Sequence, residues 1–88
     1  ADLRRQIDGI DEQLLELLAK RMRISREIGV YKKEHNMPIL QSPRYSEILE
    51  KRSNMGEQMD LSTDFVKEIL KEIHEESVRQ QMIIMNEQ

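Results

Sequence analysis

The sequence predicts an all-α fold: one very long helix, one short helix and one medium-long helix, forming an intertwined antiparallel homodimer. Apolar residues recur at helical spacing throughout the 88 residues, with no period-2 alternation. Only two prolines and three glycines interrupt this pattern. The first helical segment is also too long for so short a chain to cover alone. Residues 1–88 are therefore expected to form a single domain that completes its core by pairing.

The first helix is expected over about residues 2–35. At about 1.5 Å per residue it would be about 50 Å long, whereas a compact domain of this size has a radius of gyration of about 12 Å. A second chain must then cover part of its apolar side, and a two-fold dimer is the simplest arrangement. Its apolar residues follow a 4-3 heptad spacing, with one seven-residue gap: Leu3, Ile7, Ile10, Leu14, Leu17, Ile24, Ile28 and Tyr31. We call this set the seam.

The two shorter helices have recognisable starting points. The second is expected to begin at Ser42-Pro43, because serine is a good N-cap and proline suits the first helical position. It is expected to end at about Gly56, and the third helix to begin at Ser62 and run nearly to the end of the chain.

Composition argues against several classes of protein. A net charge of −3 disfavours general nucleic-acid binding. No apolar run is long enough to span a membrane, and neither end resembles a secretory signal. The sequence contains no cysteine and no Cys/His cluster, so we expect neither disulfides nor a metal site. These features together favour a cytoplasmic protein.

Polar residues occupy positions where the helices call for apolar ones. Arg21 fills the gap in the seam, and Lys32 lies on the same face about 16 Å further along the axis. Ser77 and Gln81 interrupt the apolar face of the third helix in the same way. Arg44 follows the proline-bracketed stretch. Because a buried cation is costly unless an anion meets it, these residues predict a donor-rich cavity for a small dianion.

Arg4 cannot join this cavity within its own chain, because it lies about 25 Å from Arg21 along one rigid helix. In an antiparallel dimer, the beginning of one long helix passes near the middle of its partner. Arg4 is therefore expected to reach the partner's cavity, which gives two composite sites per dimer.

Taken singly, these residues have simpler explanations. An arginine on a helix seam more often pairs with a carboxylate or extends into solvent, and a lone glutamine can set the register of packed helices. His35 and His74 have no partners at metal-ligand spacing, and both are expected at the surface. The occurrence of five such polar residues together favours a ligand site over these separate explanations.

In this order and spacing, the residues resemble the AroQ class of all-helical chorismate mutases over the whole chain, so residues 1–88 would be one chorismate mutase-like domain. The motif opens with Leu3-Arg4-x-x-Ile7-Asp8-x-Ile10-Asp11-x-x-Leu14-Leu15-x-Leu17-Leu18-x-x-Arg21. It continues with Ile28-Gly29-x-x-Lys32, Pro38-Ile39 and Arg44, and closes with Glu76-Ser77-x-x-x-Gln81.

The resemblance implies the [3,3] rearrangement of chorismate to prephenate, an isomerisation in phenylalanine and tyrosine biosynthesis. That reaction needs no cofactor, metal or covalent intermediate. Lys32 and Gln81 would be the catalytic residues, donating hydrogen bonds to the ether oxygen of the breaking bond. The residues that the resemblance implies for substrate binding are Arg4 from the partner chain, Arg21, Arg44, Ser77, Gln41 and Tyr45.

Two of these positions depart from the family pattern. The family has acidic residues at the positions of Gln41 and Tyr45, where they contact the substrate's ring hydroxyl and help to place the lysine. Gln41 can still accept a hydrogen bond, and Tyr45 can donate or accept one. Hydroxyl recognition would then persist in altered form, with weaker turnover.

Three alternatives stay open. Mutase domains of this class also occur fused to DAHP synthase, where they bind chorismate or prephenate as feedback signals. A chain that begins at Ala1 without methionine suits excision from such a fusion. Isochorismate–pyruvate lyase uses the same fold and a cationic cavity, and Tyr45 slightly favours it. The third alternative is a helical dimer without a ligand.

Overall fold

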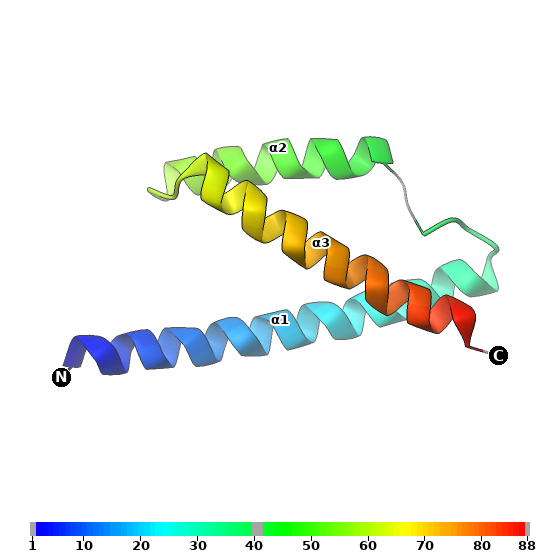
Figure 1. Cartoon of the computed structure of the whole chain (residues 1–88), viewed down its shortest axis with the longest axis horizontal. Coiled ribbons are helices and arrows are strands. Elements are labelled where there is room, and N and C mark those ends of the chain that lie inside the picture. The colour runs from blue at the N-terminus through cyan, green and yellow to red at the C-terminus, as the bar shows by residue number, and fades with distance from the viewer. Residues whose placement is uncertain (1, 40–41, 88) are drawn as a thin grey trace.

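The computed structural model describes residues 2–39 and 42–87, and all of the regular structure in them is α-helical. The three helices are α1 (Asp2–Glu34), α2 (Ser42–Gln58) and α3 (Thr63–Asn86) (Figure 1). The predicted all-α fold with one very long helix is therefore confirmed. None of these helices is both long and apolar enough to cross a lipid bilayer.

The helices form an open arrangement in which α3 contacts both of the others. It packs against the C-terminal half of α1 and against α2, while the N-terminal half of α1 extends away from the other helices (Figure 1). The molecule measures 50 × 26 × 14 Å and has a radius of gyration of 15.7 Å. A compact domain of this length would have a radius of about 12 Å. One chain therefore does not close around a core of its own.

The end of α1 is fixed by a Schellman motif. Asn36 adopts the left-handed conformation, with φ of 54°, which asparagine tolerates better than most residues. The Met37 N–H donates to the Lys32 carbonyl at 2.8 Å, and the Asn36 N–H donates to the Lys33 carbonyl. Since Lys32 supplies the backbone acceptor of this motif, the last turn that carries its side chain is held in place.

The second helix ends later than predicted, at Gln58 instead of about Gly56. Gly56 lies inside the helix and is buried; a Cβ added there would lie 2.7 Å from Val66 Cγ2, so glycine permits the close approach of α2 and α3. The chain turns at Asp60, which has φ of 63°, and the Leu61 N–H donates to the Gly56 carbonyl in a second Schellman motif.

The start of α3 agrees with the prediction. Ser62 is the N-cap, and its side chain accepts a hydrogen bond from the Phe65 N–H.

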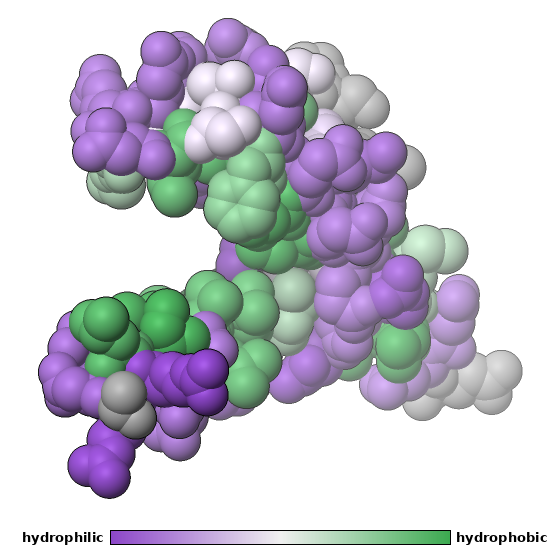
Figure 2. Space-filling view, turned by 60° about the vertical axis from the view of Figure 1, so that its left-hand side comes forward, coloured by the Kyte–Doolittle hydropathy of each residue, from purple (hydrophilic) through white to green (hydrophobic). Residues whose placement is uncertain are grey.

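No hydrophobic side chain of the described residues is buried. The buried side chains are small or polar, and the N-terminal part of the seam is open: Leu3, Ile7, Ile10, Leu14 and Leu17 are between 52% and 74% exposed. Figure 2 shows apolar side chains gathered along this part of the molecule, facing the hollow between α1 and α2. Such a large exposed apolar surface is typical of an interface.

Candidate functional site

The three helices line one cavity of about 280 Å³. Four cationic side chains contribute to its wall, two from α1 and two from α2: Arg21, Lys32, Arg44 and Arg52. No aspartate or glutamate of the described part of the chain lines it. The charge of this cavity is therefore left for a bound anion to neutralise.

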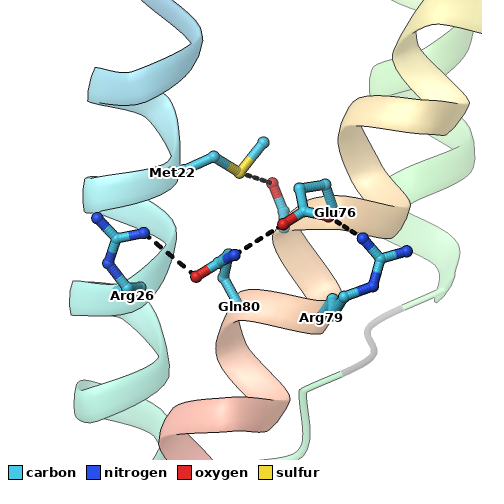
Figure 3. Close-up of polar contacts among 6 residues, drawn as sticks. Met22, Arg26, Glu76, Arg79 and Gln80 are labelled. Atoms are coloured by element: carbon cyan, nitrogen blue, oxygen red, sulfur yellow. Dashed lines mark hydrogen bonds and ion pairs between the residues drawn. The ribbon is translucent and has the colours of Figure 1, made fainter.

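Ser77 of α3 lines the cavity and contacts three residues of α1. Its Oγ accepts hydrogen bonds from Arg21 Nη1 at 2.6 Å and from Ser25 Oγ at 3.0 Å. It also lies 3.8 Å from the sulfur of Met22, and this contact is drawn in Figure 3. A hydroxyl accepts two hydrogen bonds and donates one, so all its capacity is used. Ser77 is 7% exposed and therefore acts as a fixed support for the Arg21 guanidinium.

Lys32 of α1 and Gln81 of α3 also line the cavity and are hydrogen-bonded to each other. The ammonium of Lys32 donates to Gln81 Oε1 at 3.1 Å and to the Ile39 carbonyl at 2.7 Å. An ammonium has three N–H bonds, so one remains to donate to a ligand. Because the oxygen of the Gln81 amide accepts from the lysine, its NH₂ group remains as a second donor.

Close packing of α1 on α3 makes both contacts possible. A Cβ at Gly29 would lie 3.1 Å from Gln81 Cα and 3.3 Å from Ile84 Cβ, so only glycine fits there without displacement. Ser25, one turn earlier, is also buried and small. These two residues bring the helices near enough for side chains of α1 to reach Ser77 and Gln81.

The cations of the cavity are unfavourable in the absence of an anion. Burial lowers the pKa of Lys32. Burial also lowers the pKa of Arg21, and repulsion from the nearby Arg52 lowers it further. Both effects disfavour the positive charge, and the charge of a negative ligand in the cavity would oppose them.

A second polar chain runs beside this cavity on the same two helices (Figure 3). Arg26 Nη1 of α1 donates to Gln80 Oε1 at 3.2 Å, and Gln80 Nε2 donates to Glu76 Oε2 at 2.7 Å. Glu76 also forms an ion pair with Arg79. These contacts fix the rotation of α3 about its axis, and thereby the direction in which Ser77 and Gln81 point.

The structure brings together six of the predicted site residues: Arg21, Lys32, Arg44, Tyr45, Ser77 and Gln81. Arg4 is exposed on the open half of α1 and does not line the cavity of its own chain. Gln41 lies outside the described residues.

Two further residues of the cavity were missed by the sequence analysis. The expectation that His74 lies at the surface was wrong: it is half-buried, lines the cavity and stacks on Tyr45. Arg52 also lines the cavity. Helical spacing carried the signal, because His74 lies three residues before Ser77, and Arg52 continues the face of α2 that contains Tyr45 and Ile48. His35 is exposed, as predicted.

A cavity lined by cations and by amide and hydroxyl donors is suited to a small anion. Comparison with known families identifies the family of the chain. Residues 3–82 match the family described as chorismate mutase type II, and the chain belongs to that family.

Curated relatives agree with this assignment. The chain is 33% identical over 76 residues to the T-protein of Haemophilus influenzae, covering 86% of the chain and 20% of that protein. It is 35% identical over 83 residues to a bifunctional chorismate mutase/prephenate dehydratase of Buchnera aphidicola subsp. Schizaphis graminum, covering 94% and 22%. The corresponding Escherichia coli (strain K12) protein is 29% identical over 85 residues, covering 97% and 22%. The chain thus spans about a fifth of the length of these relatives.

Proposed function

We propose that the chain is a chorismate mutase, which converts chorismate to prephenate by a [3,3] rearrangement in aromatic amino acid biosynthesis. The observation that carries this proposal is the cavity in which four cations face no carboxylate of the described chain and in which Lys32 is hydrogen-bonded to Gln81. Chorismate is a dianion of suitable size, and its reaction requires no nucleophile or base.

Binding would itself favour the reactive shape of the substrate. The enolpyruvyl arm of chorismate must lie over the ring before the new carbon–carbon bond can form. Arg21, held by Ser77 at 2.6 Å, and Arg44 on α2 approach the cavity from different helices and can hold the two carboxylates. Fixing both ends of the substrate removes much of the entropy cost of reaching the compact geometry.

Lys32 and Gln81 would act on the breaking bond. As the ether bond lengthens, negative charge grows on its oxygen. The remaining N–H of the Lys32 ammonium and the NH₂ of Gln81 can donate to that oxygen without rearrangement, because their mutual hydrogen bond already places them. Such donors stabilise the transition state more than the ground state, which is the requirement for catalysis.

Tyr45 would contribute to recognition of the ring hydroxyl, since it lines the cavity and its phenol can donate or accept. A corresponding role for Gln41 stays a prediction.

A homodimer would complete both the core and the site. The open N-terminal half of the seam, with Leu3 74% exposed, needs an apolar cover, and a second copy of α1 running antiparallel supplies a matching surface. In that arrangement, Arg4 of the partner subunit would enter the cavity as a further cation for the substrate carboxylates. The 15.7 Å radius of gyration supports this arrangement, because an isolated chain leaves its apolar surface in water.

Fusion partners, feedback regulation and location are further properties of the protein. Two of the relatives described above are bifunctional proteins that carry, by name, a prephenate dehydratase. Fusion to DAHP synthase, a feedback role and a cytoplasmic location stay predictions.

The direct test is a steady-state assay of the purified chain with chorismate. We expect prephenate to form well above the spontaneous rate. Lys32→Ala should lower kcat by about 10²–10³-fold, because it removes a donor to the transition-state oxygen. Lys71→Ala is the matched control, since Lys71 is exposed on α3 and does not line the cavity.

Absence of prephenate formation above the spontaneous rate would overturn the proposal. Release of pyruvate from isochorismate, without turnover of chorismate, would instead assign the cavity to the lyase reaction.

A further inference from the structure

The chain contains two stacked tyrosine–histidine pairs in different surroundings. Tyr31, in the last turn of α1, stacks on His35, the residue that follows this helix, with ring centroids 4.1 Å apart and an interplanar angle of 25°, and both residues are exposed. Tyr45 and His74 stack across the α2–α3 contact, with centroids 3.8 Å apart and an angle of 19°. Both rings of this second pair line the cavity. The first pair therefore provides an internal control for the second.

We propose that His74 is a positioning residue, whose ring holds Tyr45 against the cavity so that the phenol hydroxyl is fixed for hydrogen bonding to the bound dianion. The inference rests on the proposed function, because it assigns a role within the same cavity. Tyr45 lies in the first turn of α2, and helix ends fray more readily than helix centres. His74 lies in the middle of α3 and provides a firm surface against which that turn can pack.

The surroundings of His74 favour the neutral form of its imidazole. Burial lowers the pKa of His74, and the positive charges of Arg21 and Lys32 lower it further, while Glu75 opposes them. These effects favour the neutral ring, which adds no further positive charge to the cavity. The charged groups that surround the ring or share its cavity come from all three helices: Arg21 and Lys32 of α1, Arg44 and Arg52 of α2, and Glu75 of α3.

The hydrogen-bonding properties of a phenol explain why Tyr45 benefits from a stacked neighbour. A phenol is a weaker and less mobile hydrogen-bonding group than a carboxylate, so its contribution depends on where the ring is held. Aromatic pairs contribute stabilisation beyond the area that they bury. If the stack is lost, Tyr45 can turn away from the cavity, and recognition of the ligand weakens while the Lys32–Gln81 donors stay in place.

Four variants test the proposal through steady-state kinetics with chorismate. His74→Leu removes the stack, and we expect KM to rise about two- to tenfold, with a smaller change in kcat. His74→Phe keeps an aromatic surface and should restore most of the parent KM at neutral pH. Tyr45→Phe should raise KM as His74→Leu does, and the double variant Tyr45→Phe/His74→Leu should lose no more than either alone. A merely structural role for His74 predicts additive losses and no rescue by phenylalanine.

His35→Leu is the matched control, because it removes the other stack without touching the cavity, and its KM should equal that of the parent. Circular dichroism of every variant checks that it is folded. An active parent whose KM is unchanged by His74→Leu would overturn the inference while leaving the proposed function intact.

Proton NMR gives a readout that does not depend on turnover. The chain has two histidines, so the ring signals of His35 serve as a reference in the same spectrum. Titration of the chain should show His74 with a midpoint below that of a free imidazole, and addition of chorismate should shift the ring protons of His74 but not those of His35. If chorismate does not shift the ring signals of His74, the inference is overturned, whether or not the parent is active. If the parent binds chorismate without converting it to prephenate, the proposed function fails but the shift of the His74 signals remains.

Discussion

The two halves of α1 carry the same heptad seam but have different surroundings. Residues 18–34 pack on α3, and the buried positions there are Ser25 and Gly29. Residues 2–17 extend away from the other helices in Figure 1, and every one of them is exposed. Small residues and polar interruptions thus occur where the chain meets itself, and large apolar residues dominate where it does not. The difference indicates that each half is adapted to a different partner.

The packed half carries the polar side chains that line the cavity, and the open half carries an exposed apolar face. In the packed half, hydrogen bonds from Arg21 and Lys32 to α3 take the place that a hydrophobic core would otherwise fill. In the open half, Leu14 and its neighbours on the seam offer an apolar face without a described cover. Stability of the folded state is therefore expected to depend chiefly on the open half, and activity on both.

A charge placed in the open half should have the largest effect. Leu14→Glu puts a carboxylate in the proposed dimer interface, where an unpaired ion costs several kcal/mol. We expect the mass in solution, measured by light scattering, to fall from twice the 10.5 kDa of one chain towards a single chain. Activity should fall at least tenfold with it. Gln13→Glu is the matched control, because it adds the same group beside the seam; an unchanged mass for Leu14→Glu would refute the assignment of the interface.

Two glycines sharpen the comparison between the halves. Gly29→Ala should lower the free energy of unfolding by about 1–3 kcal/mol, because the new Cβ would crowd Gln81 and Ile84. It should also lower kcat by displacing Gln81. Gly9→Ala should instead stabilise the chain by up to about 1 kcal/mol, because no atom lies within 4 Å and alanine favours a helix. Urea unfolding of both variants measures these changes in the free energy of unfolding. Equal changes for Gly29→Ala and Gly9→Ala would contradict the difference between the two halves of α1.

Much of this contrast could be predicted from the sequence, because helical periodicity is a local property. The spacing of the seam gave the length of α1, and Ser62 marked the start of α3. Polar residues on the apolar faces of two helices, such as Arg21 in the gap of the seam and Gln81 on α3, indicated the cavity, because helical geometry places positions three, four or eleven apart on one face.

The remaining features depend on how the helices approach one another. Gly56 was interpreted as the end of a helix, whereas it permits close contact with Val66. His74 was interpreted as a surface residue, because nothing in its own helix reveals the ring of Tyr45 on the next one. Arg52 was missed although it shares the face of α2 that contains Tyr45 and Ile48. Contacts between helices depend on their crossing geometry, which a single sequence does not encode locally.

Lowering the pH should decrease the free energy of unfolding slightly, and this is the smallest expected effect. The pKa of His74 in the folded chain lies below its ordinary value of 6.5, chiefly through burial. Below that pH the unfolded chain binds more protons than the folded one, so the free energy of unfolding decreases as the pH falls, and it is unaffected above. Because the ring is partly solvated, we expect a loss of no more than about 0.5 kcal/mol. Urea unfolding at several pH values should show that His74→Phe removes this part of the slope; a parent-like slope in His74→Phe would assign it to other groups.

In the proposed dimer, the open half of one α1 and the packed half of another meet in a single site. Co-expression of two inactive chains tests this arrangement most directly. Arg4→Ala and Lys32→Ala should each be nearly inactive as pure dimers. In an equal mixture that forms dimers at random, each mixed dimer has one site without either change, so about a quarter of the wild-type rate should return. A mixture no more active than its two parents, with mixed dimers demonstrated by mass spectrometry, would contradict the composite site.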